Sequence, residues 1–369
     1  MISYKVVVIY CLHVASLSSV FAQRCNGGAQ CVTLQQCSGL YTQLQDGNTP
    51  ELTRLLRSLH CGFQDEDPKI CCPPEFRGIK NQGSTVPTQS TRVGAPSTLL
   101  PDFTKCGIQF RDRIVGGTQA DLDEHPWMAL IRYDKPNGWG FYCGGVMISH
   151  RYILTAAHCV KGQGLPPTWR LSQVRLGEYN IKTAQDCTSE YCSDAPVDVQ
   201  VEETIVHENY DAEDNNQQND IALLRLSQDI PYSDYIQPIC LPTTNALKNS
   251  NYDGYRAEVA GWGKTETRSE SDVKLKVQVP VVSNTECSNV FGNVGRRISN
   301  KQLCAGGEPG KDSCRGDSGG SLMVQTPNEN WVAIGVVSYG PSPCGTPGWP
   351  GVYTRVGAFI DWITSHMRP

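Results

Sequence analysis

Short apolar segments separated by polar turns run through most of the chain after residue 113, and they predict β-strands. Residues 127–131 and 331–337 are typical, because aromatic, aliphatic and β-branched residues gather there between turn residues. Residues 358–363 differ, since their Phe, Ile and Trp have the spacing of a short amphipathic helix. The pattern therefore predicts an all-β domain that ends in a helix.

The first 113 residues have another character and divide into three parts. Residues 1–22 contain Lys5, a mostly apolar stretch and small residues at the end, which is typical of a secretory signal. Residues 23–72 are rich in cysteine. Residues 73–105 are rich in Pro, Gly, Ser and Thr and predict an extended linker, which continues into the stretch that ends at residue 113. With the all-β domain at 114–369, we expect four parts in all.

Composition indicates the compartment and excludes two classes of function. Of 17 cysteines, Cys11 lies in the expected signal and the other 16 are even in number, as in an oxidised extracellular protein. The net charge is −5 with both signs mixed, so no basic block indicates nucleic-acid binding. No stretch after the signal approaches the roughly 20 apolar residues that span a membrane. We expect a secreted protein with no membrane span.

Three separated motifs indicate catalysis by a serine nucleophile. Ser318 stands in the glycine-rich stretch 316–320 (Gly-Asp-Ser-Gly-Gly), His158 in Thr-Ala-Ala-His-Cys, and Asp220 in Asn-Asp-Ile-Ala-Leu-Leu. A serine hydroxyl is a poor nucleophile, so it needs a base to take its proton and donors to hold the oxyanion. An imidazole supplies the base, and a carboxylate orients the imidazole.

The order His, Asp, Ser resembles the chymotrypsin-like serine proteases and differs from subtilisins and α/β-hydrolases. The resemblance implies two six-stranded antiparallel β-barrels, with the triad in the cleft between them. The apolar pattern of residues 358–363 predicts that the C-terminal helix packs its Phe, Ile and Trp on the second barrel. It implies that Ser318 attacks, that His158 transfers protons, and that Asp220 orients His158. It also implies an oxyanion hole made by the N–H groups of Gly316 and Ser318.

The same family resemblance implies an inactive precursor. The stretch 111–117 (Arg-Asp-Arg-Ile-Val-Gly-Gly) is similar to the activation site of these zymogens. Cleavage after Arg113 would free the α-amino group of Ile114, which in the family turns inward and pairs with the aspartate before the nucleophile, here Asp317. The segment 73–113 is therefore interpreted as linker plus activation segment.

Substrate preference is implied by Asp312, six residues before Ser318. In trypsin-like members an aspartate at this position forms the floor of the pocket for the cleaved residue. A buried carboxylate there demands a cationic partner, so we expect cleavage after Arg or Lys. The expected walls of this pocket are Ser338, Tyr339, Gly340 and Gly351.

Residues 25–72 carry six cysteines, and so small a unit needs disulfides to replace a large core. The adjacent Cys71 and Cys72 and the long gap after Cys37 resemble the clip domain of arthropod serine proteases. Within the gap, residues 49–57 predict a short helix. The resemblance implies eight disulfides: Cys25–Cys71, Cys31–Cys61, Cys37–Cys72, Cys106–Cys240, Cys143–Cys159, Cys187–Cys192, Cys287–Cys304 and Cys314–Cys344.

No cofactor is expected for catalysis, but a structural calcium ion is a hypothesis. The loop from 176 to 180 (Leu-Gly-Glu-Tyr-Asn) resembles the calcium loop of trypsin, and calcium takes six to eight oxygen ligands. Glu178, Asn180 and either Asp186 or Asp194 could supply some of them. The alternative is an ordinary polar loop.

The resemblance implies limited proteolysis after Arg or Lys in an arthropod extracellular cascade, in haemolymph. Members of the family cut prophenoloxidase, the Spätzle precursor that activates the Toll pathway, or another clip-protease zymogen, so melanisation and innate immunity are the expected contexts. A separate upstream protease and a serpin inhibitor are the other expected partners. Three alternatives stay open: a relay protease in a developmental or clotting cascade, a non-catalytic clip-domain cofactor, and a digestive trypsin.

Overall fold

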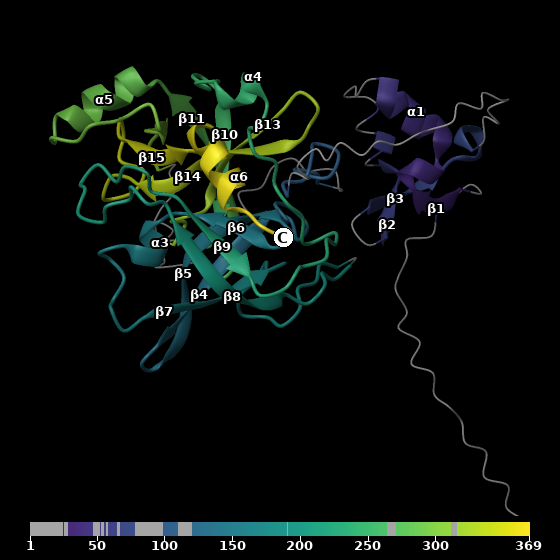
Figure 1. Ribbon diagram of the computed structural model, residues 1–369, viewed down its shortest axis with the longest axis horizontal. Coiled ribbons are helices and arrows are strands. Elements are labelled where there is room, and N and C mark those ends of the chain that lie inside the picture. The colour runs from purple at the N-terminus through teal and green to yellow at the C-terminus, as the bar shows by residue number, and fades with distance from the viewer. Residues whose placement is uncertain are drawn as a thin grey trace, which may run out of the picture.

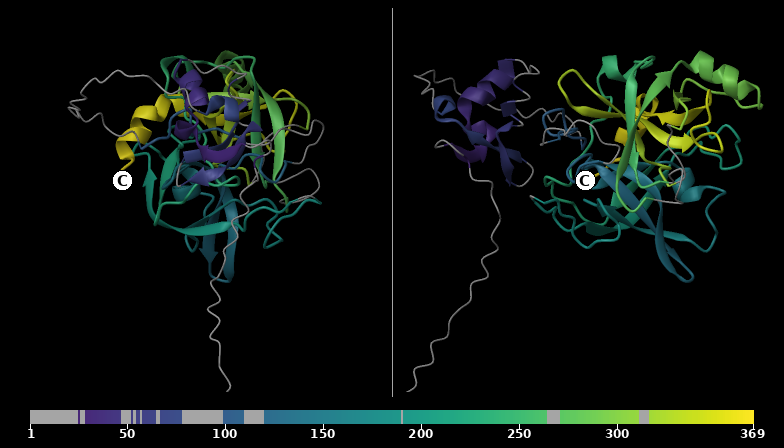
Figure 2. Two further views of the ribbon diagram at one scale, coloured as in Figure 1. Left: turned by 90° about the vertical axis from the view of Figure 1, so that its right-hand side faces the viewer. Right: turned by 180° about the vertical axis from the view of Figure 1, so that it is seen from behind.

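The computed structural model describes residues 25, 29–46, 52, 55–56, 58–64, 67–77, 99–109, 120–189, 191–263, 271–310 and 316–369. Two β-barrels form the larger body, and a small three-stranded sheet with helix α1 (Ser38–Asp46) lies beside them (Figure 1). In Figure 2 the small unit lies in front of the barrels in the left view and to one side of them in the right view. The predicted fold class, two six-stranded antiparallel barrels after a disulfide-rich unit, is confirmed.

The first barrel closes in the order β4-β5-β6-β9-β8-β7. Its strands are β4 Met128–Lys135, β5 Gly138–Ser149, β6 Tyr152–Thr155, β7 Arg170–Leu176, β8 Val197–Val206 and β9 Ala222–Leu226, and the short helix α3 His158–Lys161 follows β6. Every neighbouring pair is antiparallel. Closure matters because it leaves no strand edge open along the barrel wall.

The second barrel repeats this arrangement in the order β10-β11-β12-β15-β14-β13. Its strands are β10 Arg256–Gly261, β11 Leu275–Val282, β12 Gln302–Gly306, β13 Ser321–Gln325, β14 Trp331–Tyr339 and β15 Pro350–Arg355. Its helical elements are α4 Asn245–Lys248, α5 Asn284–Gly292, η3 Val356–Phe359 and α6 Ile360–His366. Helix α5 begins at an N-cap, Ser283, whose side chain accepts a hydrogen bond from the Glu286 amide.

The small unit is an antiparallel sheet in the order β1-β3-β2. Its elements are β1 Gln30–Thr33, η1 Leu34–Gln36, α1 Ser38–Asp46, β2 His60–Gln64, β3 Asp67–Cys72 and η2 Pro74–Phe76. Its core holds few side chains beyond Leu40, Leu52 and Ile70 and the cystines. Of the predicted helix 49–57, Leu52, Leu55 and Leu56 are helical and the other positions lie outside the described residues. Helix α1 was not predicted.

Seven disulfides join described cysteines, and they are the expected pairs. They are Cys25–Cys71, Cys31–Cys61, Cys37–Cys72, Cys106–Cys240, Cys143–Cys159, Cys187–Cys192 and Cys287–Cys304. Cys344 is also disulfide-bonded. Its expected partner, Cys314, lies outside the described residues. Three of the seven lie in the small unit, which has the smallest apolar core to support it.

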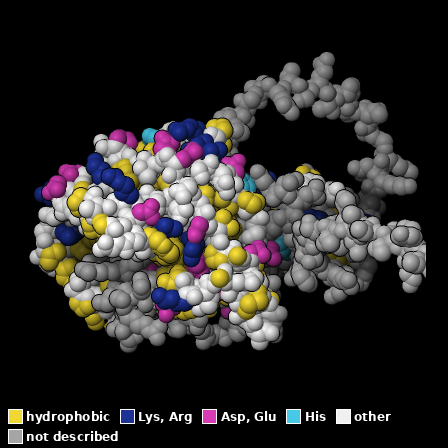
Figure 3. Space-filling view, turned by 90° about the horizontal axis from the view of Figure 1, so that it is seen from below, with side chains coloured by type: hydrophobic (Ala, Val, Ile, Leu, Met, Phe, Trp, Pro, Cys, Tyr) yellow, Lys and Arg dark blue, Asp and Glu magenta, His cyan; other side chains and the backbone are white. Residues whose placement is uncertain are grey.

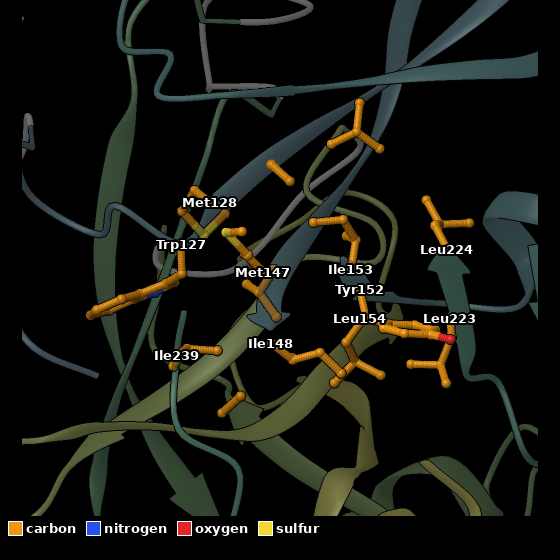
Figure 4. Packing of buried hydrophobic residues seen from close by; sticks show 14 of the residues in the cluster. Trp127, Met128, Met147, Ile148, Tyr152, Ile153, Leu154, Leu223, Leu224 and Ile239 are labelled. Atoms are coloured by element: carbon orange, nitrogen blue, oxygen red, sulfur yellow. The ribbon is translucent and has the colours of Figure 1, made fainter. Parts of the chain in front are cut away.

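The main core fills the first barrel and continues to the junction of the two barrels. Figure 4 shows Met147, Ile153 and Leu154 of the first barrel packed together, with Trp127 at one edge of the cluster. The Trp127 indole N–H points at Met323 Sδ in the second barrel, 3.0 Å away. Because this cluster holds residues of both barrels, it fixes their relative position and so the two sides of the cleft between them.

The C-terminal helix packs differently from the sequence-based expectation. We expected it on the second barrel, but the rings of Phe359 and Trp362 contact His207 of the first barrel, with centroids 5.3 and 5.1 Å away. The backbone beyond the helix also reaches the first barrel, because the Tyr152 hydroxyl donates to the Arg368 carbonyl oxygen. On the other side, Lys248 of α4 pairs with Asp361. The helix therefore joins the barrels.

The visible face in Figure 3 has acidic and basic side chains interspersed over the barrels, in keeping with a net charge of −5. Within the described residues, every helix is too short or too polar to cross a membrane.

Candidate active site

The three candidate catalytic residues come from three separate strand ends at the junction of the barrels. His158 begins α3 directly after β6, and Asp220 precedes β9, the strand that pairs with β6. Ser318 precedes β13 of the second barrel. The Gly144 amide of β5 donates to the Ser318 carbonyl oxygen at 2.8 Å. The disulfide sulfur of Cys159, next to His158, lies 3.6 Å from the same oxygen. The fold thus brings together residues from both barrels.

Asp220 is fully buried and holds His158 in one orientation. One carboxylate oxygen accepts the His158 backbone N–H at 2.8 Å, and the other lies 2.8 Å from His158 Nδ1. Because an ionised carboxylate only accepts, the Nδ1 atom carries the proton and Nε2 has a free lone pair. This tautomer is the one that a general base needs.

Two residues that the sequence analysis did not connect with Asp220 complete its surroundings. The Ser338 hydroxyl donates to Asp220 Oδ2 at 2.5 Å, and the Thr354 hydroxyl donates to the Asp220 carbonyl oxygen at 2.7 Å. Ser338 was predicted only as a wall of the substrate pocket, and Thr354 was not predicted. No local motif could have identified them, because 118 and 134 positions separate them from Asp220.

Burial and charge act in opposite directions on this pair. Burial alone would lower the pKa of His158, but the Asp220 charge and the hydrogen bond to Asp220 raise the pKa of His158 above its ordinary value. Burial alone would raise the pKa of Asp220, but His158 and Ser338 hold the pKa of Asp220 below its ordinary value. Asp220 therefore stays ionised and stabilises the imidazolium form of His158.

The turn that carries Ser318 requires glycine at two positions. Gly316 and Gly319 have φ of +100° and +79°, a backbone region that side chains rarely adopt. A Cβ on Gly319 would lie 2.2 Å from Thr155 Oγ1 and 2.6 Å from the Gly144 carbonyl oxygen. Gly319 therefore lets the turn pack closely against the first barrel, and Gly316 lets it pack against Gly263 after β10.

The backbone around Ser318 leaves two amides for a ligand. The N–H groups of Gly319 and Gly320 donate to Val337 and Asp317 carbonyl oxygens. Among the described residues, no backbone oxygen accepts from Gly316 N or Ser318 N. These two are the predicted oxyanion donors. No hydrogen bond joins the Ser318 hydroxyl to His158 among the described side chains; such bonds often tighten only with substrate.

The expected pocket walls lie on neighbouring strands. Tyr339, at the end of β14, pairs with Val352 of β15, which is the residue that follows Gly351 in the sequence. Ser338 is buried, Tyr339 is half-buried and Gly340 is exposed, so this strand end passes from the core to the surface of the cleft. Asp312, the expected floor, lies outside the described residues.

Of the three activation residues, only Asp317 is described. Its Oδ1 atom accepts the Gly263 amide at 2.9 Å. A Cβ on Gly261 or on Gly263 would lie 2.3 or 2.4 Å from the Asp317 carboxylate, so this side chain packs tightly against the end of β10 and the glycine just beyond it. Arg113 and Ile114 lie outside the described residues.

The oxygens proposed for calcium already accept protein hydrogen bonds. Glu178 accepts from the Tyr179 amide at 2.8 Å and from Arg175 at 3.1 Å. Asp186 accepts from the Asn180 amide at 3.0 Å and from the Thr183 hydroxyl. Calcium would have to displace these donors. A donor set of this kind fits an ordinary polar loop better than a cage for six to eight oxygen–calcium bonds. Asp194, the other acidic residue considered, lies beyond the disulfide Cys187–Cys192.

Comparisons with known proteins match both units of the chain. The family model described as Trypsin matches residues 114–363, and the model described as Regulatory CLIP domain of proteinases matches residues 25–72. CLIP domain-containing serine protease HP8 of Bombyx mori is 60% identical over 366 residues, which cover 99% of this chain and 98% of that protein. Spaetzle-processing enzyme of Drosophila melanogaster is 40% identical over 373 residues, which cover 96% and 92%.

A solved structure agrees with the sequence comparisons. The crystal structure of the Drosophila Grass clip serine protease of the Toll pathway has a TM-score of 0.64 and 35% identity, covering 91% of this chain and 93% of that chain. The similarity therefore extends over both the small sheet and the two barrels.

Proposed function

Because the chain belongs to the trypsin family of serine proteases and carries a regulatory CLIP domain, we propose that it is a secreted zymogen activated by cleavage after Arg113. The active form cuts protein precursors after arginine or lysine in an extracellular immune cascade. The observation that carries this proposal is the buried Asp220 carboxylate, 2.8 Å from His158 Nδ1, at the strand end that faces the Ser318 turn.

Catalysis proceeds by acyl transfer under this proposal. His158 Nε2 takes the proton of the Ser318 hydroxyl as Ser318 Oγ attacks the scissile carbonyl carbon, and then gives that proton to the leaving amine. In the second half-reaction, His158 Nε2 takes a proton from water as the water oxygen attacks the acyl carbon. It then gives a proton to Ser318 Oγ as the ester bond breaks. Asp220 stabilises the imidazolium form without accepting its proton. The raised pKa of His158 supports this role, because the imidazole then binds a proton more readily in the transition state.

The oxyanion is held by backbone amides. As the carbonyl carbon becomes tetrahedral, its oxygen gains negative charge, and the N–H groups of Gly316 and Ser318 donate to it. Such a donor contributes about 3–4 kcal/mol to transition-state stabilisation. Their lack of an acceptor among the described backbone oxygens supports the assignment. No cofactor is needed, because trypsin-like proteases supply both proton transfer and oxyanion stabilisation from the chain itself.

Preference for arginine or lysine is proposed from Asp312. Its carboxylate would form the floor of a pocket whose walls are Ser338, Tyr339, Gly340 and Gly351, and a guanidinium or ammonium would neutralise it. The pairing of β14 with β15 supports a continuous wall, because it sets Tyr339 beside the residue that follows Gly351.

Activation is proposed to couple a new chain terminus to the oxyanion hole. Cleavage after Arg113 frees the Ile114 ammonium, which pairs with Asp317. Asp317 lies between the two oxyanion residues in sequence, so moving its side chain moves their amides. The disulfide Cys106–Cys240 spans the cleavage position, and the active enzyme is therefore two disulfide-linked chains.

The position in a cascade is the finer part of the proposal. We infer that the substrate in haemolymph is prophenoloxidase, the Spätzle precursor or another clip-protease zymogen. A relative named Spaetzle-processing enzyme supports the second. An upstream protease cuts Arg113, and a serpin ends the activity.

The first test uses the full-length zymogen cut after Arg113. It should react with a serine-directed fluorophosphonate and release a dye from Arg and Lys peptides, but not from matched Gln peptides. Ser318→Ala, cut in the same way, is the control and should do neither. Absence of labelling in the wild-type enzyme would refute catalysis and leave a non-catalytic cofactor.

The second test finds the substrate. New N-termini are sequenced in haemolymph treated with the cut enzyme and with cut Ser318→Ala. Termini in prophenoloxidase or a cytokine precursor make the enzyme a terminal protease. Termini at an Ile-Val-Gly-Gly site of another zymogen make it a relay. Uncut Ser318→Ala zymogen added to plasma should still be cleaved after Arg113 if the activator is a separate protease.

A further inference from the structure

A pocket of about 320 Å³ opens beside His158. We use "polar pocket" for the space lined chiefly by Tyr142, His158, Gln163, Gln217, Arg296 and Tyr339. Arg296 follows α5 of the second barrel, whereas Gln163 and Gln217 belong to loops of the first. The pocket thus lies across the junction of the barrels. A larger cavity, of about 540 Å³, is lined by residues of α4, α5 and η3 and includes none of the catalytic candidates.

The polar pocket lies on the amino side of the proposed cleavage position. Ser338 and Tyr339 line it, and both also belong to the expected wall for the cleaved arginine. In an acyl-enzyme the wall at 338–340 holds the acyl half of the substrate, so the residues before the arginine continue past the same strand end. An extended chain advances about 3.3 Å per residue. The pocket is therefore within reach of the three residues that precede the cleaved arginine.

Arg296 is the residue that gives this pocket a charge. Its guanidinium lies over the Tyr339 ring at 4.5 Å and donates to the Asn215 carbonyl oxygen. These two contacts hold the group in place without neutralising it. Among the described residues, Arg296 forms no ion pair with a carboxylate. The described lining includes no aspartate or glutamate.

Asp214, which interacts electrostatically with Arg296, has hydrogen bonds of its own. The Arg296 charge helps to lower the pKa of Asp214. The Asp214 carboxylate accepts hydrogen bonds from the backbone amides of Asn216 and Gln218 at 2.9 and 3.1 Å. It also accepts from the Asn216 side chain. The Asp214 carboxylate is thus hydrogen-bonded within its own loop and does not form an ion pair with the Arg296 guanidinium.

We propose that Arg296 makes the polar pocket a subsite for an acidic side chain among the three residues before the cleaved arginine of the substrate. A planar guanidinium held by stacking is preorganised for two hydrogen bonds to a carboxylate. The amides of Gln163 and Gln217 are further polar groups of the same pocket. This inference rests on the proposed protease function and adds the class of sequence that it selects.

The test measures kcat/KM on fluorogenic peptides that end in arginine. Glu, Gln or Lys is placed in turn at each of the three preceding positions, with alanine elsewhere, and the all-alanine peptide reports basal activity. We expect Glu over Gln by about fivefold to tenfold at one position, which is the size of a partly exposed charge-assisted pair. The preference should shrink as salt rises.

Variants connect the preference to one residue. Arg296→Gln should bring the Glu-to-Gln ratio close to one, and Arg296→Glu should make Lys preferred over Glu. The matched control is Arg297→Gln, which removes the same charge at the neighbouring exposed position and should keep the wild-type ratio.

Each outcome decides the inference. A ratio near one in the wild-type enzyme at all three positions overturns it, and so does a preference that survives in Arg296→Gln. Cleavage of the all-alanine peptide separates this failure from failure of the proposed function. If that peptide is not cut and no fluorophosphonate label appears, both proposals fall together.

Discussion

Replacing Gly319 by alanine tests how closely the Ser318 turn packs against the first barrel. A second glycine variant measures the effect of backbone strain alone. Gly319 has φ +79°, and its amide donates to the Val337 carbonyl oxygen at 3.0 Å. An added Cβ would lie 2.2 Å from Thr155 Oγ1, about 1.2 Å inside the 3.4 Å at which ordinary contact begins. It would also lie 2.6 Å from the Gly144 carbonyl oxygen, a backbone atom of β5 that cannot turn aside.

The turn must therefore move by about an ångström, and Ser318 moves with it. A displacement of this size costs about 100-fold in rate. We expect kcat/KM of Gly319→Ala to fall by about 100-fold or more on an arginine peptide. Fluorophosphonate labelling should slow in parallel, because it depends on the same nucleophile.

The chain offers a matched control in Gly254. This residue has φ +78°, donates to the Val281 carbonyl oxygen at 3.0 Å, and has no atom within 4 Å of an added Cβ. Gly254→Ala thus adds the same backbone strain, about 1 kcal/mol, without the collision. Its Tm should fall by about 2–4 °C with kcat/KM unchanged. Equal kcat/KM in the two variants would refute the steric argument.

Three further results are expected. Asp220→Asn should lower kcat/KM by about 10⁴-fold. It should also move the acid limb of the pH profile to lower pH, because burial then lowers the pKa of His158 without an opposing charge; an unmoved limb contradicts this. Tyr133→Phe removes a buried 2.6 Å hydrogen bond to the Cys159 carbonyl oxygen, so the free energy of unfolding should fall by about 1–2 kcal/mol. A Tm equal to that of the wild type would contradict this stabilising role. EDTA should leave Tm unchanged, since Glu178 already accepts protein donors; a drop would support calcium.

The sequence by itself carried the local chemistry and the fold class. Residue type determines whether a turn can adopt φ of +100° at Gly316, whether a strand segment is apolar enough to be buried, and which side chains can act as nucleophile or base. These are properties of short stretches, so the motifs around His158, Asp220 and Ser318 could be recognised without coordinates. Resemblance to a family then implied the barrels and the disulfide pairs, because those depend on the whole chain.

Only the tertiary structure decided which distant groups complete the site. Ser338 and Thr354 hydrogen-bond to Asp220, from which they are 118 and 134 positions away in the sequence. Arg296 follows α5 and Tyr339 ends β14, and only the folded second barrel places the guanidinium over the tyrosine ring. The C-terminal helix also joined both barrels, although its own pattern gave only an apolar face. Periodicity tells which side of an element is buried. It does not tell what covers that side, because the partner is chosen by packing between segments far apart in the chain.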